Sequence, residues 1–173
     1  MEYMIELRDI FKVFPTKNGD VTAINGVSLN IARGEIFGII GMSGAGKTTL
    51  VRCINYLEKP TSGEVVIDGQ NLGSLSRGAL NMLRHSVGMV FQGFNLLMQK
   101  NVMHTVMFPA LISGMDKAAA RRRAAELLEI VGLPDTPRSY PAQPAGGQQR
   151  GGAMPRALML NPTLLPVAEA PAA

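Results

Sequence analysis

The eight residues from Gly41 to Thr48, GMSGAGKT, constrain this chain more than any other stretch. They match the pattern G-x-x-x-x-G-K-[ST] at every fixed position. By average composition, a chain of this length would carry such a match by chance on the order of one time in a hundred. In loops of this kind, glycines let successive backbone N–H groups converge on an anion, and the lysine reaches the outer phosphates. The stretch therefore predicts a phosphate-binding loop.

The sequence on either side of this loop favours a ligand site over a glycine-rich turn without a ligand. The preceding run EIFGIIG, Glu35 to Gly41, is continuously apolar, as is typical of a strand buried in a parallel sheet. The following KTTLVRCINYL predicts a helix, whose N-terminus attracts anions. Thr48 is the expected Mg²⁺ ligand. The predicted nucleotide-binding residues are Gly41, Met42, Ser43, Gly44, Ala45, Gly46, Lys47, Thr48 and Thr49.

Alternating apolar patterns at residues 3–13 and 21–31 predict two antiparallel strands, and Asn18-Gly19 between them suits a tight hairpin. GEVVIDG and VGMVF predict two further strands. Residues 116–131 predict the clearest helix, with Asp116 as N-cap and Gly132 at its C-terminal stop. Strands alternating with helices predict an α/β fold, with a helical lobe inserted at about residues 93–145.

The helix at 116–131 has an apolar face and a basic triplet. Its apolar face consists of Ala120, Ala124, Leu127, Leu128 and Val131. The triplet Arg121–Arg123 precedes Glu126 and Glu129, which favours a solvated helix face with i,i+4 pairs over a nucleic-acid patch.

Composition excludes several classes of protein. Hydrophobic residues make up 46% of the chain and charged residues 17%, which argues for a folded domain. The net charge of +4 suits phosphate ligands but falls short of the basic stripe of a nucleic-acid binder. No apolar run approaches a membrane span of ~20 residues, and the acidic start MEYMIELRD is unlike a signal peptide. Cys53, the single cysteine, is predicted to be a small buried apolar side chain.

Together, the phosphate-binding loop, Gln92 in GMVFQGFNLL, and SYPAQ with GGQ between Ser139 and Gln148 resemble the ATP-binding subunits of ABC transporters. The stretches MIELRDIFKVFPT and GEIFGIIGMSGAGKTTLVRCINYLEKPTSGEV look most like the methionine-importer branch. The resemblance covers about residues 4–148. It implies a P-loop NTPase (RecA-like) core with an N-terminal antiparallel β lobe and an inserted helical subdomain.

The resemblance also implies roles for particular residues. Phe14 lies where such subunits stack an aromatic ring on adenine; a phenylalanine in the core is the rival interpretation. Gln92 would contact Mg²⁺ and a moving lobe. Without the resemblance, it would be interpreted as an ordinary polar residue at the end of a strand. The segment Gly93–Met98 corresponds to the groove that receives a membrane permease. The expected cofactors are ATP and Mg²⁺.

The resemblance further implies an assembly. It predicts a homodimer of ATP-binding subunits on a membrane permease, at the cytoplasmic face of the membrane and with no nucleic-acid partner. An extracytoplasmic binding protein would deliver the substrate. The expected division is a β lobe and P-loop core at 1–92, a helical subdomain at 93–145, and a degenerate signature helix and Walker B strand at 146–173.

The end of the chain departs from the family. Where the family has Leu-Ser-Gly-Gly-Gln, this chain has PAGGQ, so Ala145 lacks the serine hydroxyl. Ala168 stands where the family has the Mg²⁺-shell aspartate, and Glu169 occupies the place of the water-polarising glutamate. Pro166 cannot donate to a central ladder. Gly151, Gly152 and Pro155 disfavour the intervening helix.

These departures predict nucleotide binding without efficient hydrolysis, and a chain truncated after the Walker B region that lacks the later strands and a γ-phosphate-sensing histidine. His85 and His104 lie too early to replace that histidine. Three interpretations follow: an ATP-binding subunit of an amino-acid importer, a non-hydrolysing remnant of one, and a soluble ABC-type ATPase acting on nucleic acid or ribosomes.

Overall fold

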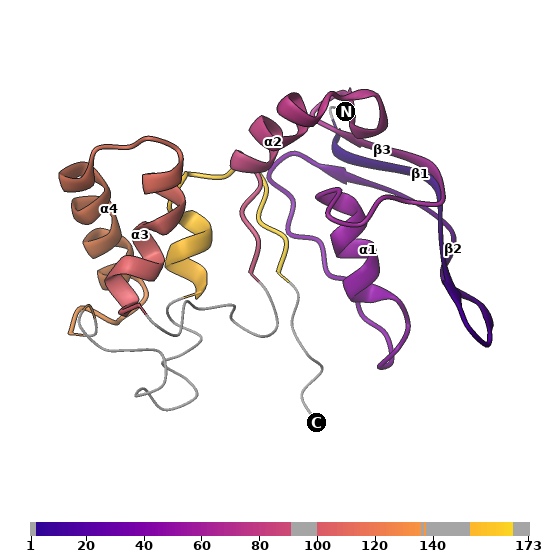
Figure 1. Ribbon diagram of the computed structural model, residues 1–173, viewed down its shortest axis with the longest axis horizontal. Coiled ribbons are helices and arrows are strands. Elements are labelled where there is room, and N and C mark those ends of the chain that lie inside the picture. Colours follow the sequence, from indigo (N-terminus) through magenta and orange to yellow (C-terminus); the bar gives the residue numbers. More distant parts are fainter. Residues whose placement is uncertain (1–2, 91–99, 136, 138–152, 168–173) are drawn as a thin grey trace. The chain divides into compact units, whose positions relative to one another are not determined.

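A computed structural model (Figure 1) describes residues 3–90, 100–135, 137 and 153–167. The chain divides into two compact units, Met1–Leu83 with Pro171–Ala173, and Arg84–Ala170. The first unit contains the phosphate-binding loop, and the second contains two long helices and a short parallel ladder. Each unit has its own buried core.

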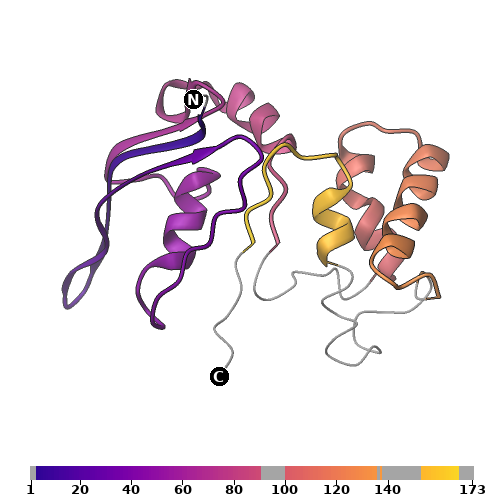
Figure 2. The ribbon, with the colours of Figure 1, turned by 180° about the vertical axis from the view of Figure 1, so that it is seen from behind.

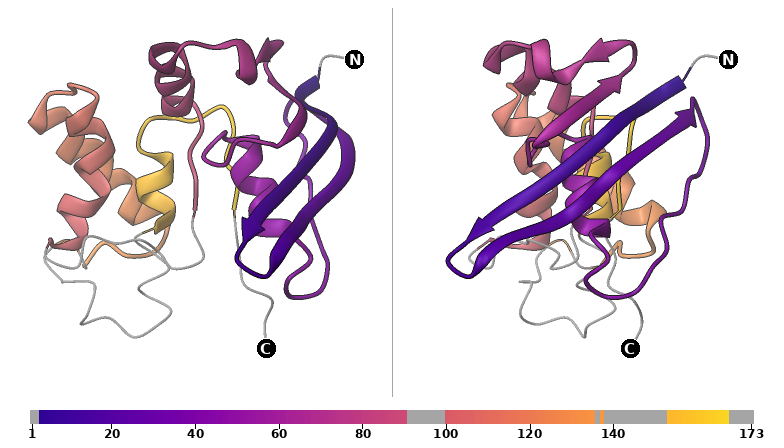
Figure 3. Two further views of the ribbon diagram at one scale, coloured as in Figure 1. Left: turned by 45° about the vertical axis from the view of Figure 1, so that its right-hand side comes forward. Right: turned by 90° about the vertical axis from the view of Figure 1, so that its right-hand side faces the viewer.

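The first unit is built on an antiparallel sheet in the order β2-β1-β3-β4. Strands β1 (Tyr3–Thr16) and β2 (Gly19–Ala32) form the long hairpin seen in Figure 3. β3 (Ser62–Ile67) pairs with β1, and the short β4 (Gln70–Asn71) pairs with β3. The predicted antiparallel lobe is therefore confirmed. The turn itself is Lys17-Asn18, because Gly19 already pairs with Thr16 across the two strands.

Helix α1 (Lys47–Ile54) lies beside this sheet (Figure 2) and confirms the helix predicted after the glycine-rich loop. Its apolar residues Leu50, Val51, Cys53 and Ile54 are buried, as are Leu7 and Ile10 of β1 and Val65 of β3. After β4 come a short 3-10 helix, η1 (Leu72–Ser74), and α2 (Arg77–His85). Burial of this apolar surface stabilises the unit.

The strand predicted at Glu35–Gly41 is not formed, so that prediction was wrong. Ile36 and Ile40 are almost fully exposed, and no ladder reaches the run within the part of the chain that the structure describes. An apolar run predicts burial, but a strand exists only where another backbone supplies its hydrogen-bond partners. The sheet of this unit consists of β1 to β4 and leaves this run outside it.

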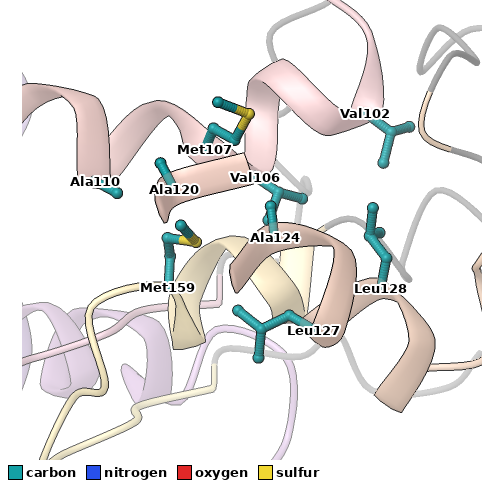
Figure 4. Close-up of a cluster of buried hydrophobic side chains, with 9 residues drawn as sticks. All are labelled: Val102, Val106, Met107, Ala110, Ala120, Ala124, Leu127, Leu128 and Met159. Atoms are coloured by element: carbon teal, nitrogen blue, oxygen red, sulfur yellow. The ribbon is translucent and has the colours of Figure 1, made fainter. Parts of the chain in front are cut away.

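The second unit is held together by α3 (Val102–Ile112) and α4 (Lys117–Ile130). Asn101 caps α3 by accepting a bond from the His104 N–H at 2.8 Å, and Asp116 caps α4 by accepting one from the Ala119 N–H at 2.9 Å. The predicted N-cap is thus confirmed. The two helices bury a common apolar cluster (Figure 4), made of Val102, Val106, Met107, Ala110, Ala120, Ala124, Leu127, Leu128 and Met159.

The basic triplet only partly matches the predicted solvated helix face with i,i+4 pairs, because Arg123 is half-buried and its pair is i,i+3. Arg121 and Arg122 are exposed. Arg123 forms an i,i+3 ion pair with Glu126 at 3.5 Å and donates a hydrogen bond to the Asn161 side chain at 2.6 Å. The pairing is therefore local to this helix and its neighbour. No described helix is long and apolar enough to cross a membrane.

The second unit also contains a short parallel ladder between residues 87–90 and 164–167, with bridges Val87 to Leu164 and Val90 to Val167. The Gly88 N–H donates to the Leu164 carbonyl at 2.9 Å, and the Val90 N–H donates to the Pro166 carbonyl at 3.0 Å. Pro166 thus takes part in the ladder through its carbonyl. In a regular parallel ladder, residue 166 would also donate to the Gly88 carbonyl, and proline has no hydrogen to donate.

Residues 153–158 are helical despite Pro155. Pro155 is one of these helical residues and is fully buried. Ala153, Ala157 and Met159 are buried as well. Gly151 and Gly152 lie outside the described residues.

Replacing Pro166 with leucine tests the account of the ladder. We expect the free energy of unfolding to rise by about 1 kcal/mol relative to the same replacement at exposed Pro134, because leucine can donate to the Gly88 carbonyl. The Pro134 variant corrects for the greater freedom that any loss of proline gives the unfolded chain. Urea denaturation of both variants measures the difference. Equal stability of the two variants would contradict the missing bond.

Candidate functional site

The glycine-rich loop leads directly into α1 and has the features of an anion cradle. Gly44 and Gly46 have φ of 82° and 83°, a left-handed conformation that favours glycine. Gly46 is the N-cap of α1 and provides no side-chain cap, and the first turn of the helix has no acidic residue. The first N–H groups of a helix have no intrahelical partner, and the helix dipole makes this end positive. The loop therefore offers uncapped amides to an anion.

Lys47, the first residue of α1, folds back over this loop. Its ammonium donates to the carbonyl oxygens of Gly41 at 2.6 Å and Met42 at 2.8 Å. The Ala45 N–H donates to the Met42 carbonyl at 3.2 Å and closes the turn. These contacts hold the one cation of the loop against its backbone carbonyls. A polyphosphate suits a site that combines this cation with the unpaired N–H groups at the start of α1.

The hydroxyl-bearing residues follow Lys47. Thr48 is exposed and Thr49 is half-buried, while Met42, Ser43 and Ala45 are exposed on the loop. Among the described residues there is no group of three or more histidine, cysteine, aspartate or glutamate side chains that could hold a metal. Mg²⁺ commonly binds through one or two protein oxygens together with substrate phosphates and water, so a single threonine hydroxyl fits such a site.

Gly46 brings the loop against the β hairpin. A Cβ atom at Gly46 would lie 2.2 Å from the carbonyl oxygen of Ala23 in β2, so only glycine permits this approach. Two residues along β2 from Ala23 is Val21, which pairs with Phe14 of β1. Phe14 is half-buried and does not belong to the core of its unit. The hairpin thus brings the predicted adenine-stacking residue to the same part of the unit as the cradle.

Lys12 is a residue that the sequence reasoning missed. Its ammonium lies 4.8 Å from the centroid of the Phe14 ring, within cation–π range. It also forms an ion pair with Glu58 at 2.6 Å. The available signal was a lysine two places before an aromatic residue on an alternating strand, where residues i and i+2 share a face.

Several predicted site residues lie outside the described part of the chain. They are Gln92, the permease-facing Gly93–Met98, the signature region Ser139–Gln148 with Ala145, Ala168 and Glu169. Their roles remain expectations from the sequence.

Cys53 lies on α1 and is fully buried, as predicted. Desolvation raises the pKa of its thiol to about 11; the nearby Lys12 lowers it and Glu58 raises it by smaller amounts. A thiol with such a pKa is almost entirely protonated at neutral pH and is a poor nucleophile. Cys53 therefore contributes to the packing of the core.

A glycine-rich loop, a lysine that closes over it and an uncapped helix N-terminus together define a P-loop nucleotide-binding protein. The sequence profile described as "ABC transporter" matches residues 24–171. The chain belongs to the ABC transporter family, and the predicted fold class is confirmed.

Comparisons with individual proteins agree with this assignment. The chain is 49% identical over 162 residues to the methionine import ATP-binding protein MetN of Brucella abortus (strain 2308), a match that covers 94% of this chain and 43% of that protein. The dimeric structure of MJ0796, a bacterial ABC transporter cassette, is 35% identical with a TM-score of 0.89 and covers 95% and 73% of the two chains. A structure of MJ0796 in a post-hydrolysis state bound to ADP and Pi is 34% identical, with the same TM-score and coverage.

This chain spans less than half the length of the MetN relatives that it matches. The likeness to the methionine-importer branch, predicted from the stretches around the P-loop and Gln92, is confirmed by this identity.

Proposed function

We propose that this chain is an ATP-binding subunit of an ABC importer that couples ATP to the uptake of an amino acid, methionine being the substrate. The observation that carries the proposal is the cradle formed by the loop, Lys47 and the uncapped N-terminus of α1. The 49% identity to methionine import ATP-binding proteins supports the choice of substrate. The ADP-bound state of MJ0796 supports the choice of nucleotide.

In this proposal the loop amides and Lys47 bind the phosphates, while Thr48 and Gln92 hold Mg²⁺. A bound Mg²⁺ would neutralise charge on the phosphate oxygens. Phe14 stacks on the adenine, since an aromatic face binds any base without needing its polar edges. Glu169 is the residue that would polarise the attacking water.

The partners follow from the same proposal. Two such subunits bind ATP together, as the dimeric structure of MJ0796 supports. They lie on the cytoplasmic face of the membrane and contact a permease through Gly93–Met98, and an extracytoplasmic binding protein supplies the substrate. Co-purification with a permease would favour this proposal over a soluble ATPase acting on nucleic acid or ribosomes. The arginine triplet is the only support for that rival, and one of its three members, Arg123, is engaged by Glu126 and Asn161.

A second candidate function is nucleotide binding without hydrolysis. Ala145 and Ala168 replace a hydroxyl donor and a metal-shell carboxylate that the family resemblance leads us to expect. Loss of one preorganised donor to a transferring phosphoryl group costs about 3 kcal/mol, and loss of a metal-shell carboxylate costs about ten- to a hundredfold in activity or affinity. Together these changes would lower turnover by about three orders of magnitude or more.

The second candidate predicts that this 173-residue chain releases phosphate from MgATP no faster than its Lys47→Ala variant does. A coupled phosphate-release assay measures both rates. Ala168→Asp alone should not restore turnover, because Ala145 still lacks the hydroxyl. Phosphate release clearly above the Lys47→Ala rate would contradict the second candidate and favour a hydrolysing subunit.

A further inference from the structure

Lys12, the cation over the Phe14 ring, is more buried and has more partners than most lysines. The Lys12 side chain is only 12% exposed. Its ammonium makes a 2.6 Å ion pair with Glu58, donates to the Lys59 carbonyl at 2.8 Å and lies 4.8 Å from the Phe14 ring centroid. An ammonium has three N–H donors and no acceptor, and Glu58 and the Lys59 carbonyl engage two of them.

The partners of Lys12 come from the segment that follows α1. The Glu58 N–H donates to the Arg52 carbonyl at 3.1 Å, which ties Glu58 to the last turn of that helix. The other end of α1 forms the anion cradle. Lys12 thus joins the strand that carries Phe14 to the C-terminal end of the phosphate-binding helix.

The backbone of β1 is already anchored beside Lys12 without its side chain. The Thr61 N–H donates to the Phe11 carbonyl at 2.8 Å, and the Val13 N–H donates to the Thr61 hydroxyl at 3.0 Å. These bonds fix where the strand lies. The Lys12 ammonium adds something that these bonds do not, because a cation over one face of the ring restricts a stacking base to the opposite face.

We propose that Lys12 is a positioning residue for the adenine of ATP. Held by Glu58 and the Lys59 carbonyl, it fixes the orientation of the Phe14 ring and occupies one of its faces, so that the base binds the other. This inference rests on the proposed binding of ATP. In this inference Lys12 contributes to binding of the adenine base and not to binding of the phosphates, which Lys47 and the loop amides bind.

The test compares two ligands that share phosphates and differ in the base. Affinities for MgATP and for magnesium tripolyphosphate are measured by calorimetry on the full chain and on Lys12→Met, which keeps an apolar stem of similar length without the charge. We expect Lys12→Met to weaken MgATP about three- to tenfold. Tripolyphosphate affinity should not change. Lys12→Arg keeps a cation over the ring and should stay within about twofold of the parent.

A double-mutant cycle with Phe14→Leu separates positioning from a structural role. If Lys12 acts through the ring, Lys12→Met will cause no further loss of MgATP affinity once Phe14 is leucine. Equal losses for the two ligands, or additive losses in the double variant, would overturn the inference and make Lys12 an anchor between β1 and the 58–61 segment. If the unmodified chain binds neither ligand, the proposed function itself is wrong. If the unmodified chain binds both ligands and Lys12→Met does not behave as expected, only the role of Lys12 is wrong.

Discussion

Lys47→Ala is expected to weaken MgATP binding at least a hundredfold. Removing one partner of a hydrogen-bonded charge pair costs about 2–5 kcal/mol, and about 3 kcal/mol corresponds to roughly a hundredfold in affinity. In the structure the ammonium closes over the loop by bonding the carbonyls of Gly41 and Met42. When a polyphosphate is present, that same ammonium is the only side-chain cation of the loop. Titration with a fluorescent ATP analogue measures the loss.

Lys117→Ala is the matched control for Lys47→Ala. Lys117 is the first residue of α4, is exposed and lies in the other compact unit. The replacement removes the same charge and the same side chain, so it corrects for the change in net charge. Circular dichroism establishes that both variants remain folded. Unchanged ATP affinity in folded Lys47→Ala would refute the P-loop assignment and the function built on it.

Gly46→Ala is expected to abolish measurable ATP binding and to lower the free energy of unfolding by about 2–5 kcal/mol. The left-handed backbone at Gly46 costs a residue with a Cβ about 1–2 kcal/mol. The added methyl group would also lie 2.2 Å from the Ala23 carbonyl oxygen, and overpacking costs about 1–3 kcal/mol more. Relief of the clash must move the loop from the hairpin, and the N–H groups at the start of α1 move with it.

Gly44→Ala isolates the contribution of the close contact. Gly44 lies in the same loop at almost the same φ, but a Cβ there would have no heavy atom within 4 Å. We expect it to lose only about 1–2 kcal/mol from backbone strain and to bind MgATP more tightly than Gly46→Ala. Urea denaturation and the same ATP titration compare the two. Equal effects at the two glycines would show that the contact with Ala23 contributes nothing.

The features that the sequence predicted correctly depend on neighbouring residues. The P-loop pattern contains its own glycines, lysine and helix start. Asp116 caps α4 by accepting a hydrogen bond from the N–H of Ala119, three residues further along the chain. The β1–β2 hairpin follows from two alternating runs and a short polar turn. Each of these needs only contacts between residues close together in the chain, so local chemistry was sufficient to specify them.

The features that the sequence did not predict correctly depend on which distant backbone comes alongside. Glu35–Gly41 has the composition of a buried strand, yet β3 pairs with β1 and this run joins no described ladder. Pro166 disfavours a central strand, yet its carbonyl accepts a bond from Val90 in a ladder that tolerates one missing donor. In both cases the sequence indicates which secondary structure a residue favours. Whether a strand forms is decided by which backbone segment lies beside it and on which side that segment pairs.

The amino-acid sequence by itself determined the family, the glycine-rich loop that leads into α1 and the N-cap of α4. Only the tertiary structure decided that Gly46 must approach the Ala23 carbonyl and that Glu58 pairs with Lys12. Glu58 is far from Lys12 along the chain, and Ala23 is far from Gly46. No periodicity or cap connects such residues, because a contact of this range exists only after the sheet and α1 have packed.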